Sequence, residues 1–141
     1  MKAFLDTNVL LDLFMKSRLS HEAATAILQV VRSGDISACM TTQSIIDAAY
    51  IQTQRCKAPT ADFKKAIRLL SEIVKTLPIL PEDIAWANRS SIDDYEDAAQ
   101  LACAQRCGCD VIVTSDKKYK SYTDIELFDP LELYTLLFSR E

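Results

Sequence analysis

The sequence has little of the residues on which several common site chemistries depend. Among its 141 residues there is one histidine, His21, which excludes sites built on several imidazole groups. Only two glycines are present, Gly34 and Gly108, so the chain holds neither a P-loop nor a glycine-rich dinucleotide loop. No apolar run approaches the roughly 20 residues that a membrane-spanning helix needs. We therefore expect no membrane span and no histidine-based site.

Cysteine content and charge balance exclude further classes. Five cysteines in a chain that opens with MKAFLD, without an apolar leader, indicate reduced thiols and a cytoplasmic protein. Cys103, Cys107 and Cys109 lack the paired spacing of a structural zinc site, so we interpret them as plain thiols, with metal or redox use as the weaker alternative. The net charge of −4 gives no broad attraction to nucleic acid. To bind a polyanion, the protein would need a metal ion or a local basic strip.

Short strand-like runs alternate with longer helical patterns along the chain. Apolar runs predict strands at 3–5, 36–40 and 110–114 and weaker strands at 77–80 and 125–128. Helical spacing predicts helices at 9–14, 20–32, 42–54, 61–75, 81–86, 95–107 and 130–138. Strands separated by helices imply crossover connections and a mostly parallel sheet. We therefore predict a single α/β domain over 1–141, a three-layer fold with about five strands flanked by helices.

Two aspartates end predicted strands. Asp6 follows the first strand, and Asp116 follows the strand at 110–114. Aspartate is a poor strand former, and in open α/β sheets ligands gather beyond the carboxyl ends of the strands. The alternative for either carboxylate is that it caps the next helix or lies at its positive N-terminus, although Thr7 or Asn8 also suits as the cap of the first helix. Their shared position nevertheless makes both candidates for one site.

The helix predicted from residue 95 carries a third candidate. Asp94 is suited to cap this helix, and Asp97 shares a face with the apolar Leu101. An inward carboxylate costs several kcal/mol of desolvation unless a cation or donors meet it. The alternative is a first-turn acid favoured by the helix dipole, a role that Asp93 and Glu96 already fill facing outward. We therefore expect Asp97 to face the site.

The fourth candidate, Asp47, lies in the middle of a predicted helix among apolar neighbours. Its helix follows the second strand and returns over the same sheet edge, although an exposed acid on a solvated helix is the alternative. Carboxylates that meet without histidine or cysteine partners repel one another, and a hard divalent cation resolves this repulsion. The set predicts Mg²⁺ or Mn²⁺ of the kind that activates water for phosphodiester chemistry, whereas zinc is disfavoured.

The motifs in this order resemble those of the PIN-domain nucleases, including the VapC-type toxins of bacterial toxin–antitoxin pairs. Residues 4–12 resemble the N-terminal signature of that family, and 113–116 resemble its strand-end motif with the fourth acid. Asp97-Ala98, followed by Ala104, resembles the helix of the third acid. The resemblance implies a parallel five-stranded sheet, dependence on Mg²⁺ or Mn²⁺, and cleavage of single-stranded or structured RNA.

The resemblance also assigns roles to individual residues. It implies metal binding by Asp6, Asp97 and Asp116, and by Asp47 at the position of the second acid. That second acid is usually glutamate in the family, which is one methylene longer than aspartate. The shorter side chain keeps open an alternative, a PIN-like domain that binds RNA or a protein partner without cutting.

Residues around the acids receive weaker interpretations. We expect Asn8 and Thr114 to orient the acids by hydrogen bonds, with a plain cap or turn as the alternative. Lys117, Lys118 and Lys120 could steer an RNA backbone or form a solvated loop.

Two apolar helices offer surfaces for partners, and the sequence also bears on a second class of α/β protein. The apolar helices at 61–70 and 131–138 are interpreted first as core, and the resemblance adds a homodimer and an inhibitory antitoxin. A phosphoacceptor receiver-like domain is disfavoured because no acid adjoins Asp6 and the run at 77–80 ends without aspartate.

Overall fold

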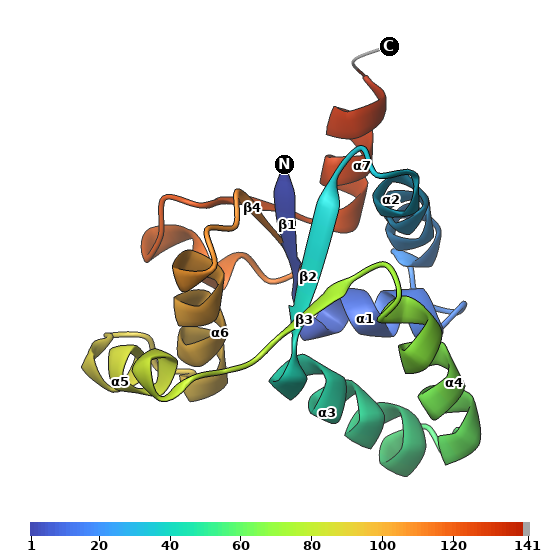
Figure 1. Cartoon of the computed structure of the whole chain (residues 1–141), viewed down its shortest axis with the longest axis horizontal. Helices are drawn as coiled ribbons and strands as arrows, with labels where there is room; N and C mark the ends of the chain where they lie inside the picture. Colours follow the sequence, from blue (N-terminus) through green and yellow to red (C-terminus); the bar gives the residue numbers. More distant parts are fainter. Residues whose placement is uncertain (140–141) are drawn as a thin grey trace.

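Five parallel strands form one sheet in the order β3-β2-β1-β4-β5. The computed structural model describes residues 1–139, except for the side chains of Lys118 and Tyr119. The strands are β1 (Lys2–Leu5), β2 (Ser37–Thr41), β3 (Lys75–Leu77), β4 (Val111–Val113) and β5 (Glu126–Phe128). β1 lies at the centre, and the later strands extend the sheet on both sides (Figure 1). The predicted parallel five-stranded α/β fold is confirmed.

Helices cover both faces of this sheet. They are α1 (Thr7–Phe14), α2 (His21–Ser33), α3 (Thr42–Tyr50), α4 (Thr60–Leu70), α5 (Pro81–Arg89), α6 (Tyr95–Arg106) and α7 (Pro130–Phe138). Two short helical turns, η1 (Ile51–Arg55) and η2 (Lys117–Ser121), complete the set. In Figure 1, α5 and α6 lie on one side of the sheet, and α1, α2, α4 and α7 lie on the other. None of the helices described is long and apolar enough to cross a bilayer.

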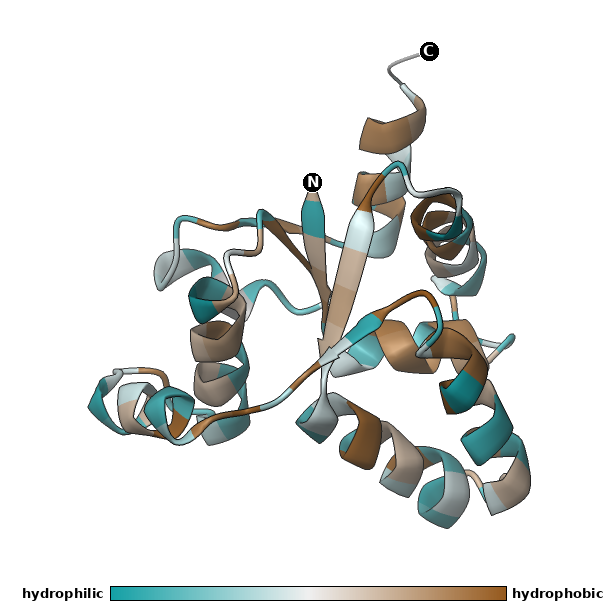
Figure 2. Ribbon diagram, viewed as in Figure 1, coloured by the Kyte–Doolittle hydropathy of each residue, from teal (hydrophilic) through white to brown (hydrophobic). Residues whose placement is uncertain are grey.

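Alternate side chains of β1 divide the core into two layers. Ala3 and Leu5 pack with Leu10 of α1 in the larger cluster, which also takes in α2, α4 and α7. Phe4 points to the opposite face and packs with Leu101 of α6. This alternation follows from the two-residue period of a strand. Figure 2 shows hydrophobic residues along β4 and in α1 and α7, beside the sheet.

The region around the third strand differs from the prediction. The sequence predicted a helix over 61–75 and a strand over 77–80, and both boundaries are wrong. α4 already ends at Leu70, and β3 occupies Lys75–Leu77 at the sheet edge, paired with β2. Pro78 has no N–H for a further ladder bond, so the strand stops before it.

The helix predicted over 42–54 also differs from the structure. α3 ends at Tyr50, and residues Ile51–Arg55 continue as the π-helical turn η1. In a π-helical turn each backbone hydrogen bond spans five residues instead of four, which widens the helix locally. The chain continues in the same direction, but the side chains after Tyr50 point in other directions around the helix axis than they would in an α-helix.

The interpretation of the cysteines as thiols is confirmed. Cys103 and Cys109 are buried, Cys107 is half-buried, and all three are free. Cys109 Sγ lies 3.5 Å from Cys39 Sγ in the core layer beneath α6. These side chains serve packing between the sheet and the α5–α6 layer.

Candidate functional site

All four predicted aspartates line one open cleft of about 530 Å³ at the carboxyl ends of β1 and β4. The cleft is lined by Asp6, Thr7, Asn8, Ile46, Asp47, Tyr50, Ile51, Arg55, Glu96, Asp97 and Asp116. The acids come from four segments: the end of β1, helix α3, the first turn of α6 and the loop after β4. Parallel strands deliver their carboxyl ends to the same sheet edge, which is why residues so distant in sequence meet.

Asp6 is the most buried of the four, with 8% of its surface exposed. Its Oδ1 accepts a 2.8 Å hydrogen bond from the Thr7 backbone N–H, and its Oδ2 accepts one of 2.8 Å from the Thr114 hydroxyl. Asp6 therefore caps α1 itself, and the predicted caps Thr7 and Asn8 are wrong. Its φ of −69° and ψ of 161° are the extended conformation that a cap residue adopts.

The surroundings of Asp6 disfavour its negative charge. Burial raises the pKa of Asp6 above its ordinary value, and the carboxylates of Asp97 and Asp116 raise it further. The hydrogen bonds from Thr114 and Thr7 offset only part of this. A cation in the cleft would relieve both the desolvation and the repulsion.

Thr114 connects the first acid to the fourth. Its side chain is fully buried, and its hydroxyl accepts a 3.0 Å hydrogen bond from the Asp116 backbone N–H while it donates to Asp6 Oδ2. The predicted orienting role of Thr114 is therefore seen in the structure. Asn8 lines the cleft, but among residues 1–139 no hydrogen bond joins its side chain to the Asp6 loop, so its predicted role is not seen.

Asp47 presents a carboxylate oxygen that lacks a donor. Its Oδ1 accepts a 2.9 Å hydrogen bond from Gln43 Nε2, one turn earlier on α3. Its Oδ2 is buried, and no hydrogen bond to it exists within the described part of the chain. A buried oxygen of this kind costs free energy unless a proton donor or a cation meets it.

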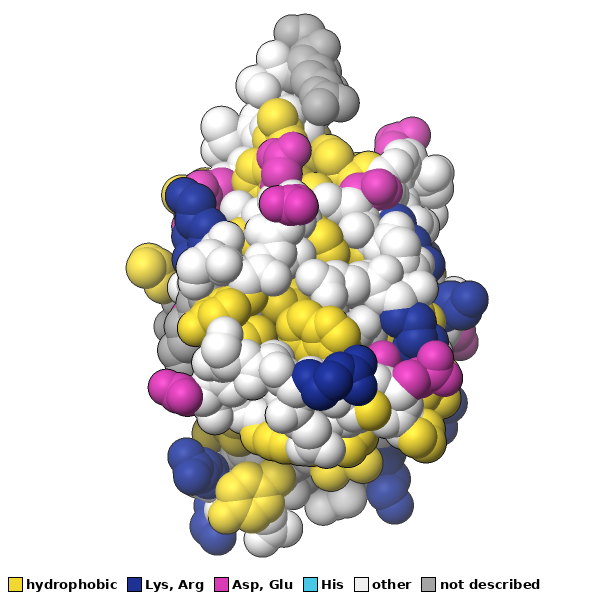
Figure 3. Space-filling model, turned by 90° about the vertical axis from the view of Figure 1, so that its left-hand side faces the viewer, with side chains coloured by type: hydrophobic (Ala, Val, Ile, Leu, Met, Phe, Trp, Pro, Cys, Tyr) yellow, Lys and Arg dark blue, Asp and Glu magenta, His cyan; other side chains and the backbone are white. Residues whose placement is uncertain are grey.

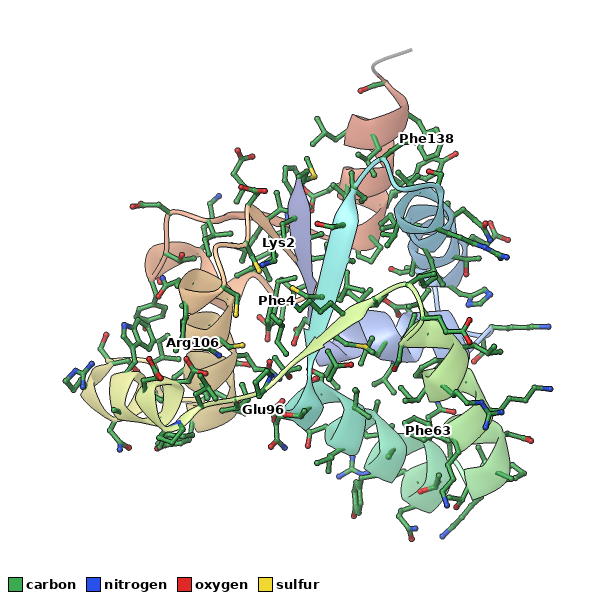
Figure 4. The ribbon with its side chains drawn as sticks, viewed as in Figure 1. Lys2, Phe4, Phe63, Glu96, Arg106 and Phe138 are labelled. Atoms are coloured by element: carbon green, nitrogen blue, oxygen red, sulfur yellow. The ribbon has the colours of Figure 1, made fainter. Side chains whose placement is uncertain are left out.

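Glu96 is a fifth acid of the cleft: its side chain is exposed, as expected, but it lines the cleft, which the sequence interpretation missed. In Figure 4 it lies between the first turn of α6 and α3. Partial burial of its carboxyl group, a hydrogen bond with the Asp47 carboxyl and the repulsion of Asp47 and Asp6 raise the pKa of Glu96 to about 7. The two carboxyl groups therefore share either a proton or a cation.

A sequence signal for Glu96 existed. Every residue from Ala98 to Ala104 is buried, so α6 has no solvent face over this stretch. Gln100 lies one turn after Glu96 on the same face, and it is only 1% exposed. A polar residue such as Gln100 on a buried stretch of helix indicates polar partners. Glu96 lies on the face of α6 that carries Gln100, so this face was a candidate to meet the polar site.

A buried hydrogen-bond network fixes the elements that carry the acids. Ser44 Oγ accepts 2.9 Å hydrogen bonds from the Thr7 hydroxyl and from Gln100 Nε2. The Thr41 hydroxyl donates to Gln100 Oε1 over 2.8 Å. These four side chains join β2, α1, α3 and α6 directly behind the cleft. The sequence interpretation singled out none of them.

Two of the three predicted lysines, Lys117 and Lys120, do not line the cleft. Lys117 forms an ion pair with Glu132 of α7, and Lys120 lies beside a separate hollow with Glu132. Lys118 lies outside the described side chains. Over the described residues of the face formed by α5 and α6, Figure 3 shows lysine and arginine scattered singly, without a continuous basic strip. Arg55 is the cation that lines the cleft, and the sequence interpretation missed it.

The donor set suits a hard divalent cation. All of the acidic ligands offer carboxylate oxygens, which Mg²⁺ and Mn²⁺ prefer, and no N–H or hydroxyl group of the described residues donates a hydrogen bond to Asp47 Oδ2. Within residues 1–139, no three of the acidic, histidine or cysteine side chains already stand in metal-binding geometry. The residues therefore fit the ion by the chemistry of their oxygens.

Comparison with known proteins identifies the class of this fold and cleft. The family model described as PIN domain matches residues 2–118. The chain belongs to the PIN-domain family.

Particular relatives make the likeness more specific. Ribonuclease VapC1 from Aquifex aeolicus (strain VF5) is 27% identical over 134 residues, which cover 89% of this chain and 88% of the relative. Among solved structures, Mycobacterium tuberculosis VapC20, a sarcin–ricin loop cleaving toxin, matches with a TM-score of 0.67 and 18% identity over 84% of this chain and 93% of that one. A toxin–antitoxin complex from Klebsiella pneumoniae matches with a TM-score of 0.64 and 17% identity over 91% and 97%. At these identities the two structures support the fold.

Proposed function

We propose that this protein is an endoribonuclease that depends on Mg²⁺ or Mn²⁺, with one catalytic domain over 1–141. The observation that carries the proposal is the convergence of Asp6, Asp47, Asp97 and Asp116 on one cleft, in which Asp47 Oδ2 accepts no hydrogen bond from a donor of the described residues. The relatives named Ribonuclease VapC1 and sarcin–ricin loop cleaving toxin support RNA as the substrate.

The four aspartates would hold the ion from different sides. Asp6 and Asp116 approach from the strand ends, Asp97 from α6 and Asp47 from α3. When bound, the ion supplies an activated water and neutralises charge on the reacting phosphate. Thr114 keeps Asp6 Oδ2 and the Asp116 loop in register, so these two ligands need little rearrangement.

Cleavage assays with matched variants test the proposal. Asp97→Asn removes one carboxylate charge from the cleft and should abolish Mn²⁺-stimulated cleavage of RNA. Asp93→Asn makes the same change at an exposed position outside the cleft, and it should cleave as the wild type does. Equal cleavage by both variants would remove Asp97 from the mechanism.

A second candidate is a PIN-like domain that binds RNA or a protein without cutting. It is favoured by the shorter acid at Asp47 and by the lack, among the described residues, of three acids already in metal-binding geometry. Titration calorimetry with Mn²⁺ separates the two candidates. Absence of binding at millimolar metal would favour the second.

We also propose an antitoxin partner and a homodimer for this chain in the cytoplasm. The toxin–antitoxin complex among the similar structures and the free cysteines support this setting. Leu19 and Leu131, which are 102% and 62% exposed, offer apolar surface for contacts between chains. Sedimentation of the isolated protein as a monomer alone would contradict the homodimer.

A further inference from the structure

One wall of the acidic cleft is aromatic and basic. Helix α3 and the turn after it supply Ile46, Tyr50 and Arg55 to the cleft lining, and we call these three residues the α3 wall. Ile46 and Tyr50 are 63% and 56% exposed, and the Arg55 guanidinium lies 5.8 Å from the centroid of the Tyr50 ring. Across the described lining of the cleft, Arg55 is the one cation beside five acids.

The turn η1 places Arg55 on the same side as Tyr50. In a regular α-helix, residues five apart point about 140° away from each other around the axis. In η1 the backbone N–H of Cys56 bonds to the carbonyl of Ile51 over 2.9 Å, a five-residue step that widens the turn. Residues five apart then point in more similar directions around the axis than in an α-helix, and the guanidinium lies over the ring.

The widened turn leaves a buried polar group unsatisfied. Gln52 is 8% exposed, and its Nε2 is buried with no hydrogen-bond acceptor in the part of the chain that is described. An unsatisfied donor of this kind costs about 1–3 kcal/mol. Exposed aromatic and apolar side chains at the rim of a charged cleft add no folding stability that would explain this cost, which favours a binding role for the α3 wall.

We propose that Tyr50 and Arg55 form a subsite for one unpaired nucleotide of the RNA, with its base on the Tyr50 ring and its adjoining phosphate on Arg55. The inference rests on the proposed nuclease function and assigns a nucleotide-binding subsite in the same cleft to two residues. Unpaired bases stack on aromatic side chains, and arginine pairs with phosphate through two parallel hydrogen bonds. A base within a duplex is already stacked on its neighbours, so the subsite selects single-stranded or looped RNA.

The charge pattern supports this occupant. Five acids repel the RNA backbone unless an ion and a protein cation offset them, and Arg55 lies at the rim where the backbone would pass. A separation of 5.8 Å is at the outer limit of a cation–π contact. The guanidinium can therefore turn to a phosphate while the ring accepts a base.

A binding cycle between protein and RNA variants tests the subsite. The probe is a short single-stranded oligoribonucleotide in Ca²⁺, together with versions that carry an abasic site at each position in turn. Tyr50→Leu should weaken binding of the intact probe roughly five- to hundredfold, the range of one stacked base. In the wild type, an abasic site at one particular position should weaken binding of the probe. In Tyr50→Leu the same abasic site should cause no further loss of affinity. Tyr50→Phe keeps the ring and should behave as the wild type does.

Further variants separate the two contacts from general effects. Arg55→Gln should weaken intact and abasic probes equally, and it should lower the slope of log affinity against log salt by about 0.7. Tyr122→Leu alters a tyrosine that is 40% exposed and outside the cleft, and it should bind the probe as the wild type does. Urea unfolding of each variant establishes that it is folded.

The outcomes distinguish this inference from the nuclease proposal. Identical abasic penalties in the wild type and Tyr50→Leu would overturn the subsite, as would an equal loss in Tyr122→Leu or no binding of the probe. If Mn²⁺-dependent cleavage persists in that case, the nuclease proposal stands without the subsite. Coupling between Tyr50 and one base in a protein that never cleaves would overturn the nuclease proposal alone.

Discussion

The Thr114 hydroxyl donates a 2.8 Å hydrogen bond to Asp6 Oδ2, and this bond joins the ends of two neighbouring strands. Asp6 Oδ1 is already held by the Thr7 backbone N–H, so both carboxylate oxygens have a fixed direction. The first acid of the cleft is therefore oriented by the protein before any ion arrives.

Thr114→Val should destabilise the protein and weaken metal binding. The substitution keeps the shape of a fully buried side chain but removes the donor to Asp6 Oδ2. We expect a loss of about 1–3 kcal/mol in the free energy of unfolding and weaker Mn²⁺ binding by calorimetry. Thr114→Ser retains the hydroxyl and should keep most of the metal affinity. Unchanged Mn²⁺ affinity in the valine variant would show that this hydrogen bond does not orient the site.

Gln100→Leu should loosen the arrangement of α6 against α3. It removes the side chain that donates to Ser44 and accepts from Thr41, so each of these buried hydroxyls loses one hydrogen bond. Urea unfolding should show a loss of roughly 1–3 kcal/mol, accompanied by slower RNA cleavage. The control is Gln105→Leu on the exposed side of the same helix, for which about 0.5 kcal/mol or less is expected. An equal effect of both substitutions would contradict the role of the network.

The carboxylate of Asp83 should make the free energy of unfolding depend on pH. Its side chain is 2% exposed and accepts two 2.9 Å hydrogen bonds from Arg106. Burial raises the pKa of Asp83, but the Arg106 bonds and the Leu80 N–H outweigh it, and the net pKa is lowered from 3.8. This stabilisation is therefore complete above pH 3.8 and is lost as the pH falls through the lowered pKa.

The measurement is urea unfolding of the wild type and Asp83→Asn from neutral to strongly acidic pH. Near neutrality the variant should be less stable by roughly 1.5–3 kcal/mol, because it loses a hydrogen-bonded charge pair. The difference should shrink as Asp83 becomes protonated in the wild type. A difference that stays constant over the whole range would contradict the lowered pKa.

Asp47→Glu should bind Mn²⁺ at least as tightly as the wild type. The added methylene extends the carboxylate into the cleft, where Asp47 Oδ2 now lacks a donor, and it matches the glutamate of the family pattern. Asp47→Asn keeps the size of the side chain but removes its charge, so it should bind Mn²⁺ more weakly. Calorimetry compares the three proteins. Weaker binding by the glutamate variant than by the asparagine variant would exclude this position from the ion.

Part of this site could be predicted from the sequence, because strand ends leave a clear signal. Asp6 and Asp116 end apolar runs, and parallel strands bring such ends to one edge, which is where both residues lie. Asp97 was placed by its helical spacing to Leu101. Glu96 was missed because the helix dipole alone explains an exposed first-turn acid next to a cap, and the cleft that it lines is formed only by the folded chain.

The remaining misses come from tertiary contacts. Residues 71–75 continue a helical pattern, but hydrogen bonding of Lys75–Leu77 to β2 overrides it. The turn η1 changes hydrogen-bond spacing without changing the apolar pattern, so neither it nor the pairing of Arg55 with Tyr50 could be read from periodicity.

Anomalous diffraction from a crystal soaked in Mn²⁺ tests the central claim most directly. We predict one strong peak in the cleft, bound directly by at least one of the carboxylates of Asp6, Asp97 and Asp116 and reached by the others through bound water. A peak that is absent from the cleft at saturating Mn²⁺, or that lies only on other surfaces, would contradict the account.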